Sequence, residues 1–259
     1  MKVVLFCGGL GTRLREHSET IPKPLVCIGH RPIIWYLMKY YAYYGHKEFI
    51  LCLGYKGCAI KDYFLNYQET DSNDFVISEG GKKVELLGED LSDWKITFAD
   101  TGLSSNIGQR LKAVQKYIGD DEYFLANYSD GLSDVDLEEL VKHAKETDAV
   151  ASFVVVIPPH SFHSVKSLED GMVQEIKEVS EADYWVNGGF FVFKNEIFNY
   201  MQEGEELVEE PFRRLVKKNK LYAKKYEGFW AAMDTLKDKK RLDGIYESGI
   251  LPGMIRNKD

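Results

Sequence analysis

The sequence has no long apolar run and no excess of basic residues. A membrane-spanning helix needs about 20 consecutive apolar residues, and no segment of this chain approaches that length. The 41 acidic residues outnumber the 33 basic ones, which gives a formal net charge of −8. Proteins that hold nucleic acid through its phosphates carry basic stripes. We therefore expect neither nucleic acid nor a membrane as a partner, whereas a small anion in a locally positive pocket is compatible with this charge.

Cysteine and histidine are few and scattered. The four cysteines form no C-x-x-C pair, and the six histidines have no set of neighbouring ligands at metal-binding spacing. This pattern argues against a zinc site and favours reduced cysteines packed in the core. The chain enters an apolar, strand-like run directly after its first residues, without a signal-like region, so we expect a cytoplasmic protein.

Short apolar segments alternate with amphipathic ones. The predicted strands are 3–6, 49–53, 96–99, 123–126, 150–156 and 189–193. Helical periodicity marks 31–44, 107–118 and 134–145. Nearly continuous apolar strands that alternate with helices predict an α/β fold with a doubly wound, mostly parallel sheet. In such a fold, ligands bind at the carboxyl ends of the strands.

No long linker or internal repeat divides the chain, so we predict one domain over 1–259. Pro158-Pro159 interrupts the alternation of strands and helices. The stretch 158–186 is predicted to be a small antiparallel β excursion, and 235–259 a helical C-terminal segment.

The most informative stretch follows the first predicted strand. Gly8, Gly9 and Gly11 stand there with Thr12 and Arg13, and Lys23 follows within Pro22-Lys23-Pro24. A backbone without Cβ atoms can turn its N–H groups toward a phosphate, and the two cations add fixed positive charge. The stretch therefore predicts a polyphosphate site, although a tight strand–helix turn with a surface arginine would also explain the glycines.

The loop matches neither common nucleotide motif. A dinucleotide fingerprint needs Gly or Ala where Leu14 stands, and an acidic residue about twenty positions further on, where the sequence has Ile33 and Ile34. A P-loop needs a Lys-Ser/Thr pair directly after its last glycine. These mismatches argue against a nicotinamide-dependent oxidoreductase.

Two aspartates are candidates for a metal site. Asp130 follows the predicted strand 123–126, and Asp234 follows the aromatic pair Phe229-Trp230. Mg²⁺ takes a few carboxylate oxygens and otherwise binds phosphates and water, which suits two aspartates beside a polyphosphate. The alternatives are a turn-forming Asp-Gly for Asp130 and a helix N-cap for Asp234.

Two further segments carry weaker signals. Ser104, Ser105 and Arg110 lie at the start of the predicted helix 107–118, where free N–H groups favour anions, although simple N-capping by either serine is compatible. Asn187, before a Gly-Gly pair, could hydrogen-bond a polyol.

Together these motifs resemble the sugar-1-phosphate nucleotidylyltransferases, and within them the glucose-1-phosphate cytidylyltransferases. The segments that carry the resemblance, in order, are 8–13, 22–24, 52–57, 100–105, 110–111, 187–191, 210–211, 228–230 and 233–236. It covers nearly the whole chain and implies a Rossmann-like fold of the nucleotide-diphospho-sugar transferase type. It also implies condensation of CTP with a sugar 1-phosphate, or a different phosphorylated acceptor, to a CDP-linked product and pyrophosphate.

The resemblance also implies residue roles. The catalytic residues would be Arg13, Lys23, Asp130 and Asp234, with both aspartates binding Mg²⁺. The nucleotide would contact Phe6, Cys7, Gly8, Gly9, Leu10, Gly11, Thr12, Arg13, Lys23, Ser105, Arg110 and Ser129. The acceptor would contact His163, Val179, Asn187, Gly188, Glu210 and Trp230. Family members are commonly oligomeric, so we expect a homo-oligomer.

The sequence departs from the family pattern on the acceptor side. A family lysine that holds the sugar phosphate is Val179 here, and a glycine near the sugar is His163. Ser129 replaces the glycine before the metal aspartate, and Ile21 replaces a lysine. Our hypothesis is an acceptor other than glucose 1-phosphate. Two alternatives are use of UTP, dTTP or GTP, and a catalytically weak nucleotide-binding homologue with a regulatory role.

Overall fold

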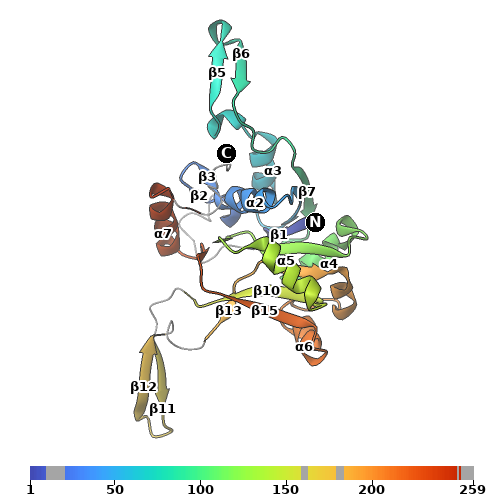
Figure 1. The fold of residues 1–259 in the computed structure, drawn as a ribbon, viewed down its shortest axis with the longest axis vertical. Coiled ribbons are helices and arrows are strands. Elements are labelled where there is room, and N and C mark those ends of the chain that lie inside the picture. The colour runs from blue at the N-terminus through green and yellow to red at the C-terminus, as the bar shows by residue number, and fades with distance from the viewer. Residues whose placement is uncertain (10–20, 159–162, 179–183, 250, 252–259) are drawn as a thin grey trace.

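The computed structural model describes residues 1–9, 21–158, 163–178, 184–249 and 251 (Figure 1). Its main sheet contains, in spatial order, β13 (Val186–Asn187), β10 (Ala151–Val156), β14 (Phe191–Lys194), β8 (Tyr123–Tyr128), β1 (Lys2–Phe6), β4 (Glu48–Leu53) and β7 (Lys95–Asp100), with β15 (Leu221–Tyr226) paired to β10. β1 runs parallel to β4 and β8, and β4 runs parallel to β7. β14 is antiparallel to β8 and to β10. The mostly parallel sheet predicted from the apolar runs is thus confirmed.

Helices cover both faces of the sheet (Figure 1). One core cluster joins the sheet to α2 (Ile33–Tyr43), α3 (Gly57–Leu65), α5 (Leu137–Glu146) and α7 (Leu236–Glu247). The other joins it to α4 (Ile107–Ile118), η6 (Asn195–Tyr200) and α6 (Glu210–Lys217). β1 lies between the two clusters, so Val3, Val4 and Leu5 are fully buried. This double coverage explains why the central strands read as continuous apolar runs.

Two hairpins project from opposite ends of the molecule (Figure 1). The predicted excursion contains β11 (His163–Ser167) paired antiparallel with β12 (Val173–Glu178). The other hairpin, β5 (Phe75–Ser78) with β6 (Lys83–Leu86), has no counterpart in the sequence prediction. The remaining short elements are η2 (Lys23–Leu25), β2 (Cys27–Ile28), β3 (Arg31–Pro32), η3 (Glu69–Asp71), η4 (Glu79–Gly81), β9 (Gly131–Ser133) and β16 (Trp230–Ala232).

Several local expectations need correction. The cysteines are all free, but Cys27 and Cys58 are exposed rather than in the core. The N-cap of α4 is Asn106, which forms a capping box with Gln109, so neither Ser104 nor Ser105 caps that helix. The predicted strand 189–193 begins only at Phe191, because Gly189 and Phe190 have positive φ angles that do not fit a strand.

No helix in the described ranges is long and apolar enough to cross a membrane. The described part of the C-terminal segment contains α7, which begins after the capping box of Thr235 and Asp238. Asp234 directly precedes that cap and is therefore not the cap itself.

Candidate active site

Lys23, Asp130 and Asp234 meet at the carboxyl edge of the parallel strands. Asp130 lies in the turn after β8, and the backbone N–H of Met233 donates to its carbonyl at 2.9 Å, which brings Asp234 alongside. The Lys23 ammonium donates to Asp130 Oδ2 and, at 2.7 Å, to Asp234 Oδ1. Residues more than 100 positions apart thus form one charged cluster. Asp130 is therefore a turn residue, as one reading of the sequence predicted, and its carboxylate belongs to this cluster.

The charge state of Lys23 follows from its neighbours. Burial by itself lowers the pKa of Lys23, but the charge of Asp130 and hydrogen bonds to both carboxylates outweigh it and raise that pKa above its ordinary 10.5. The ammonium therefore keeps its proton throughout the neutral range. The side chain is 15% exposed, so the charge faces the solvent edge rather than the core.

A buried arginine holds the loop that follows β1. Arg110, in α4, donates to the carbonyls of Gly8, Leu53 and Gly102 and to Thr101 Oγ1 at 2.8–3.2 Å. These acceptors follow or end β1, β4 and β7. A Cβ on Gly8 would lie 2.1 Å from the Arg110 guanidinium, so only glycine fits there. The guanidinium thus fixes the ends of three parallel strands through bonds to their carbonyls.

Neighbouring side chains strengthen the same edge. The Ser129 hydroxyl donates to the Phe6 carbonyl at 2.8 Å and ties the end of β8 to the end of β1. The Ser105 hydroxyl donates to the Thr101 carbonyl within the loop after β7. Burial raises the pKa of the Cys7 thiol to about 12, so it is a protonated packing residue rather than a nucleophile. Gly9 is exposed, and a Cβ there would meet nothing within 4 Å.

On the other side of Asp130 lies the segment 187–190. The Asn187 amide donates to the Tyr128 hydroxyl at 3.2 Å, and Trp230 Nε1 donates to the Gly188 carbonyl at 2.8 Å. Tyr128 is two residues before Asp130, and Trp230 is four before Asp234. Because β8 lies between β1 and β14, this segment and the glycine loop flank the carboxylates from opposite sides.

Some predicted site residues are not brought into this arrangement. Glu210 begins α6, and the structure shows no hydrogen bond from it to Asn187, Gly188 or Trp230, all of which are described. Six predicted residues lie where nothing can be said of their side chains: Leu10, Gly11, Thr12, Arg13, His163 and Val179. Of these, the structure describes only the backbone of His163, which begins β11.

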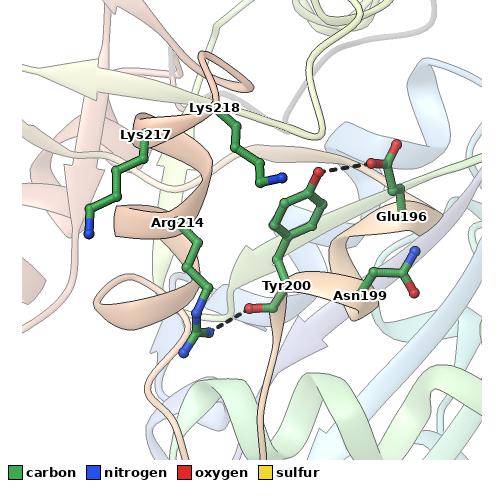
Figure 2. Close-up of a pocket in the computed structure, with 6 residues that line it drawn as sticks. All are labelled: Glu196, Asn199, Tyr200, Arg214, Lys217 and Lys218. Atoms are coloured by element: carbon green, nitrogen blue, oxygen red, sulfur yellow. Dashed lines mark hydrogen bonds between the residues drawn. The ribbon is translucent and has the colours of Figure 1, made fainter.

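A pocket of about 450 Å³ lies elsewhere, between η6 and α6 (Figure 2). Figure 2 shows the Tyr200 hydroxyl bonded to Glu196 and Arg214 bonded to the Tyr200 carbonyl. Lys194, just before η6, pairs with Tyr123 at the start of β8, whereas Asp130 follows its end. The pocket therefore begins at the opposite edge of the sheet and is separate from the cluster.

The cluster has the composition of a site for a divalent metal bound together with phosphates. Asp130 and Asp234 already share one cation, the Lys23 ammonium, so their oxygens converge. Within the described ranges, no group of three His, Cys, Asp or Glu could hold a metal. Two carboxylates suit an ion that takes its remaining ligands from phosphates and water. Fold and cluster together define an α/β protein that can bind a polyphosphate at its strand ends.

Comparison with known proteins agrees with this class. A family model for nucleotidyl transferases matches residues 2–238. A probable glucose-1-phosphate cytidylyltransferase from Bacillus subtilis is 40% identical over 251 residues, which cover 96% of this chain and 97% of that protein. The glucose-1-phosphate cytidylyltransferase of Salmonella typhi is 39% identical over 254 residues, covering 97% and 98%. The chain therefore belongs to the nucleotidyl transferase family, as the motifs predicted.

The fold agrees with solved structures. A UDP-glucose pyrophosphorylase from Acinetobacter baumannii aligns with a TM-score of 0.70 at 20% identity, covering 98% of this chain and 95% of that one. At this identity the likeness shows the fold alone. It confirms the expected α/β nucleotide-sugar transferase architecture.

Proposed function

We propose that this enzyme transfers a cytidylyl group from CTP to a sugar 1-phosphate, with Mg²⁺ as the divalent ion, and releases pyrophosphate. The observation that carries the proposal is the cluster of Lys23, Asp130 and Asp234 beside a glycine loop whose carbonyls are held by Arg110. The names of the relatives supply the base and the sugar.

The chemistry follows from the charges. A phosphate oxygen of the sugar phosphate attacks the α-phosphorus of CTP in line, and the bond from that phosphorus to the bridging oxygen of pyrophosphate breaks. The nucleophile is already an anion, so no general base is needed. The main barrier is the repulsion between two anions, and a bound Mg²⁺ would neutralise part of their charge.

The chain supplies the remaining parts. Lys23 provides a permanent positive charge beside the α-phosphate, and the loop backbone provides N–H donors. Asp130 and Asp234 are the residues that would hold the metal. Arg13, outside the described residues, is the second predicted cation. The triphosphate would lie on the β1 side of Asp130, and the sugar phosphate on the β14 side, against Asn187 and Gly188.

A product assay tests this proposal. Wild-type enzyme is mixed with each of CTP, UTP, dTTP and GTP against a panel of sugar 1-phosphates, and products are followed by phosphorus NMR. We expect a diphosphate-linked product with CTP and no comparable product with the other triphosphates. Absence of any product over the whole panel would overturn the proposal and favour a nucleotide-binding homologue without transfer activity.

The acceptor is a separate question within the same assay. The relatives' names favour glucose 1-phosphate. Val179 and His163, which replace a family lysine and glycine, favour a sugar 1-phosphate with different contacts. A rate with glucose 1-phosphate that exceeds every other acceptor would reject the second candidate.

We also propose that the chain forms a homo-oligomer. The β5–β6 hairpin exposes Phe75, Val76, Ile77 and Val84, each at 42% or more, and a lone two-stranded hairpin is marginally stable in water. A second copy of the chain that packs on this hairpin would bury the apolar side chains and stabilise the two strands. Light scattering should give a mass above one chain for wild type, and Ile77→Glu should lower it. A wild-type mass of one chain would reject this proposal.

A further inference from the structure

Asn127 is a buried polar residue inside an otherwise apolar strand. It lies in β8 and is 1% exposed, beside Ala126 and three residues before Asp130. Its Oδ1 accepts from the backbone N–H of Phe190 at 3.0 Å and from that of Tyr128 at 2.9 Å. One side-chain oxygen thus joins the end of β8 to the segment that precedes β14.

That segment needs outside support because its backbone is unusual. Gly189 and Phe190 have φ of 78° and 52°, and a left-handed conformation is unfavourable for a bulky side chain such as Phe190. The two residues form an irregular link between β13 and β14, both of which pair with β10. Without the Asn127 acceptor, the buried N–H of Phe190 would lose its partner and the link would relax.

The fit around Asn127 is close on several sides. A Cβ on Gly189 would lie 2.3 Å from Asn127 Oδ1, so the chain runs directly against the side chain. The Phe190 ring stacks on Tyr41 at a centroid distance of 6.3 Å. Neither the Tyr41 hydroxyl nor Asn127 Nδ2 has a hydrogen bond of good geometry among the described residues. Oδ1 therefore makes the hydrogen bonds of this side chain.

The segment next to Asn127 is bonded to both stretches of chain that lead to the carboxylates. Gly188 accepts from Trp230 Nε1, and the Gly189 N–H donates to Asn187 Oδ1 at 2.9 Å. Asn187 in turn reaches Tyr128 on β8. Backbone bonds with Val154 hold Gly188 and Gly189, and the Phe190 N–H is held by Asn127 Oδ1. We propose that Asn127 is a positioning residue for the sugar phosphate, because its Oδ1 fixes the left-handed end of the link 188–190, against which the acceptor binds. This inference rests on the proposed function for the identity of the ligand.

Two substitutions separate the hydrogen bond from simple packing. Asn127→Leu keeps the size of the side chain and removes the acceptor, whereas Asn127→Asp keeps an acceptor oxygen and also offers one to the Tyr41 hydroxyl. We expect Asn127→Leu to raise the KM for the sugar phosphate about tenfold, the usual effect of one lost buried hydrogen bond, and to leave the KM for CTP within about twofold. In Asn127→Asp, the KM for the sugar phosphate should lie close to the wild-type value.

A second readout does not depend on turnover. Hydrogen–deuterium exchange of the peptide 186–193 should be faster in Asn127→Leu than in wild type and close to wild type in Asn127→Asp, while exchange in 2–6 stays unchanged. If Asn127→Leu does not fold, Gly189→Ala disturbs the same contact from the other side and should give the same two effects.

The outcomes distinguish this inference from the proposed function. If wild type is inactive on all acceptors but peptide 186–193 still exchanges faster in Asn127→Leu than in Asn127→Asp, the structural role of Asn127 stands and the proposed function fails. If wild type is active and the Leu and Asp variants have equal KM values for the sugar phosphate, the positioning role is wrong. An equal rise in both KM values for Asn127→Leu would also overturn it, since that result indicates general damage.

Discussion

The two sides of the carboxylate pair are built in different ways. On the β1 side, the loop is fixed by a buried guanidinium that bonds to carbonyls after three parallel strands. On the β14 side, the irregular link 188–190 is held by backbone bonds with Val154 and by separate side-chain bonds: Asn127 Oδ1 accepts from the Phe190 N–H, Asn187 donates to Tyr128, and Trp230 donates to Gly188. The first arrangement gathers its bonds on one buried side chain, whereas the second distributes them over several residues. Substitutions on the β14 side should therefore change acceptor binding before they change folding or nucleotide binding.

The largest effect is expected at the carboxylates that both sides share. Asp130→Asn and Asp234→Asn remove charge that would hold the metal, and each should lower kcat at least about 10²- to 10³-fold. Thermal unfolding should change little, because both side chains reach the solvent edge. Asp120→Asn, an exposed aspartate before β8, is the matched control and should retain wild-type kcat. Equal losses in all three variants would contradict a specific role for the pair.

Arg110→Lys tests whether the loops of the β1 side depend on this one side chain. Lysine cannot reproduce the fork that reaches several carbonyls, so we expect a loss of about 2 kcal/mol in unfolding free energy and a higher KM for CTP. Arg213→Lys, on the exposed face of α6, should stay within about 0.5 kcal/mol. Denaturant unfolding and initial rates measure both variants. An unchanged unfolding free energy for Arg110→Lys would show that the guanidinium is not needed to fix the loops.

Trp230→Phe tests one of the individual hydrogen bonds on the β14 side. Loss of the bond to the Gly188 carbonyl should raise the KM for the sugar phosphate several-fold and leave the KM for CTP unchanged. Trp94→Phe, at a tryptophan that packs on Phe49, should leave both constants near wild type. If Trp230→Phe changes only the KM for CTP, the claim that the β14 side serves the acceptor and not the nucleotide is wrong.

The smallest effect is expected from alkaline pH on the β1 side. The pKa of Lys23 is raised above 10.5 in the folded protein, so the stability that its ion pairs contribute is present below about 10.5 and is lost only as pH rises through the higher folded value. The KM for CTP should therefore stay flat between about pH 7.5 and 9.5. A rise near pH 8 that is absent from Lys23→Arg would show that Lys23 loses its proton in the working range.

The sequence predicted the central strands because parallel strands buried on both faces are apolar runs, as in Val3–Val4–Leu5. It also placed Lys23, Asp130 and Asp234 in one site, through motifs and the rule that ligands bind at strand ends. Other features depend on residues distant in the chain. Asn127 gave a signal, a polar residue within an apolar run, but its partner Phe190 is 63 positions away. Arg110 was predicted to contact the nucleotide, whereas its bonds to carbonyls could be found only in the folded structure.

The most direct test of the account is the release of pyrophosphate from CTP and Mg²⁺ by the wild-type enzyme, with and without a sugar 1-phosphate. We predict release that depends on the sugar phosphate, stops when the metal is chelated, and is at least about 10²-fold slower in Asp130→Asn. Release that continues at the same rate without a sugar phosphate or in Asp130→Asn would contradict nucleotidyl transfer at this carboxylate pair.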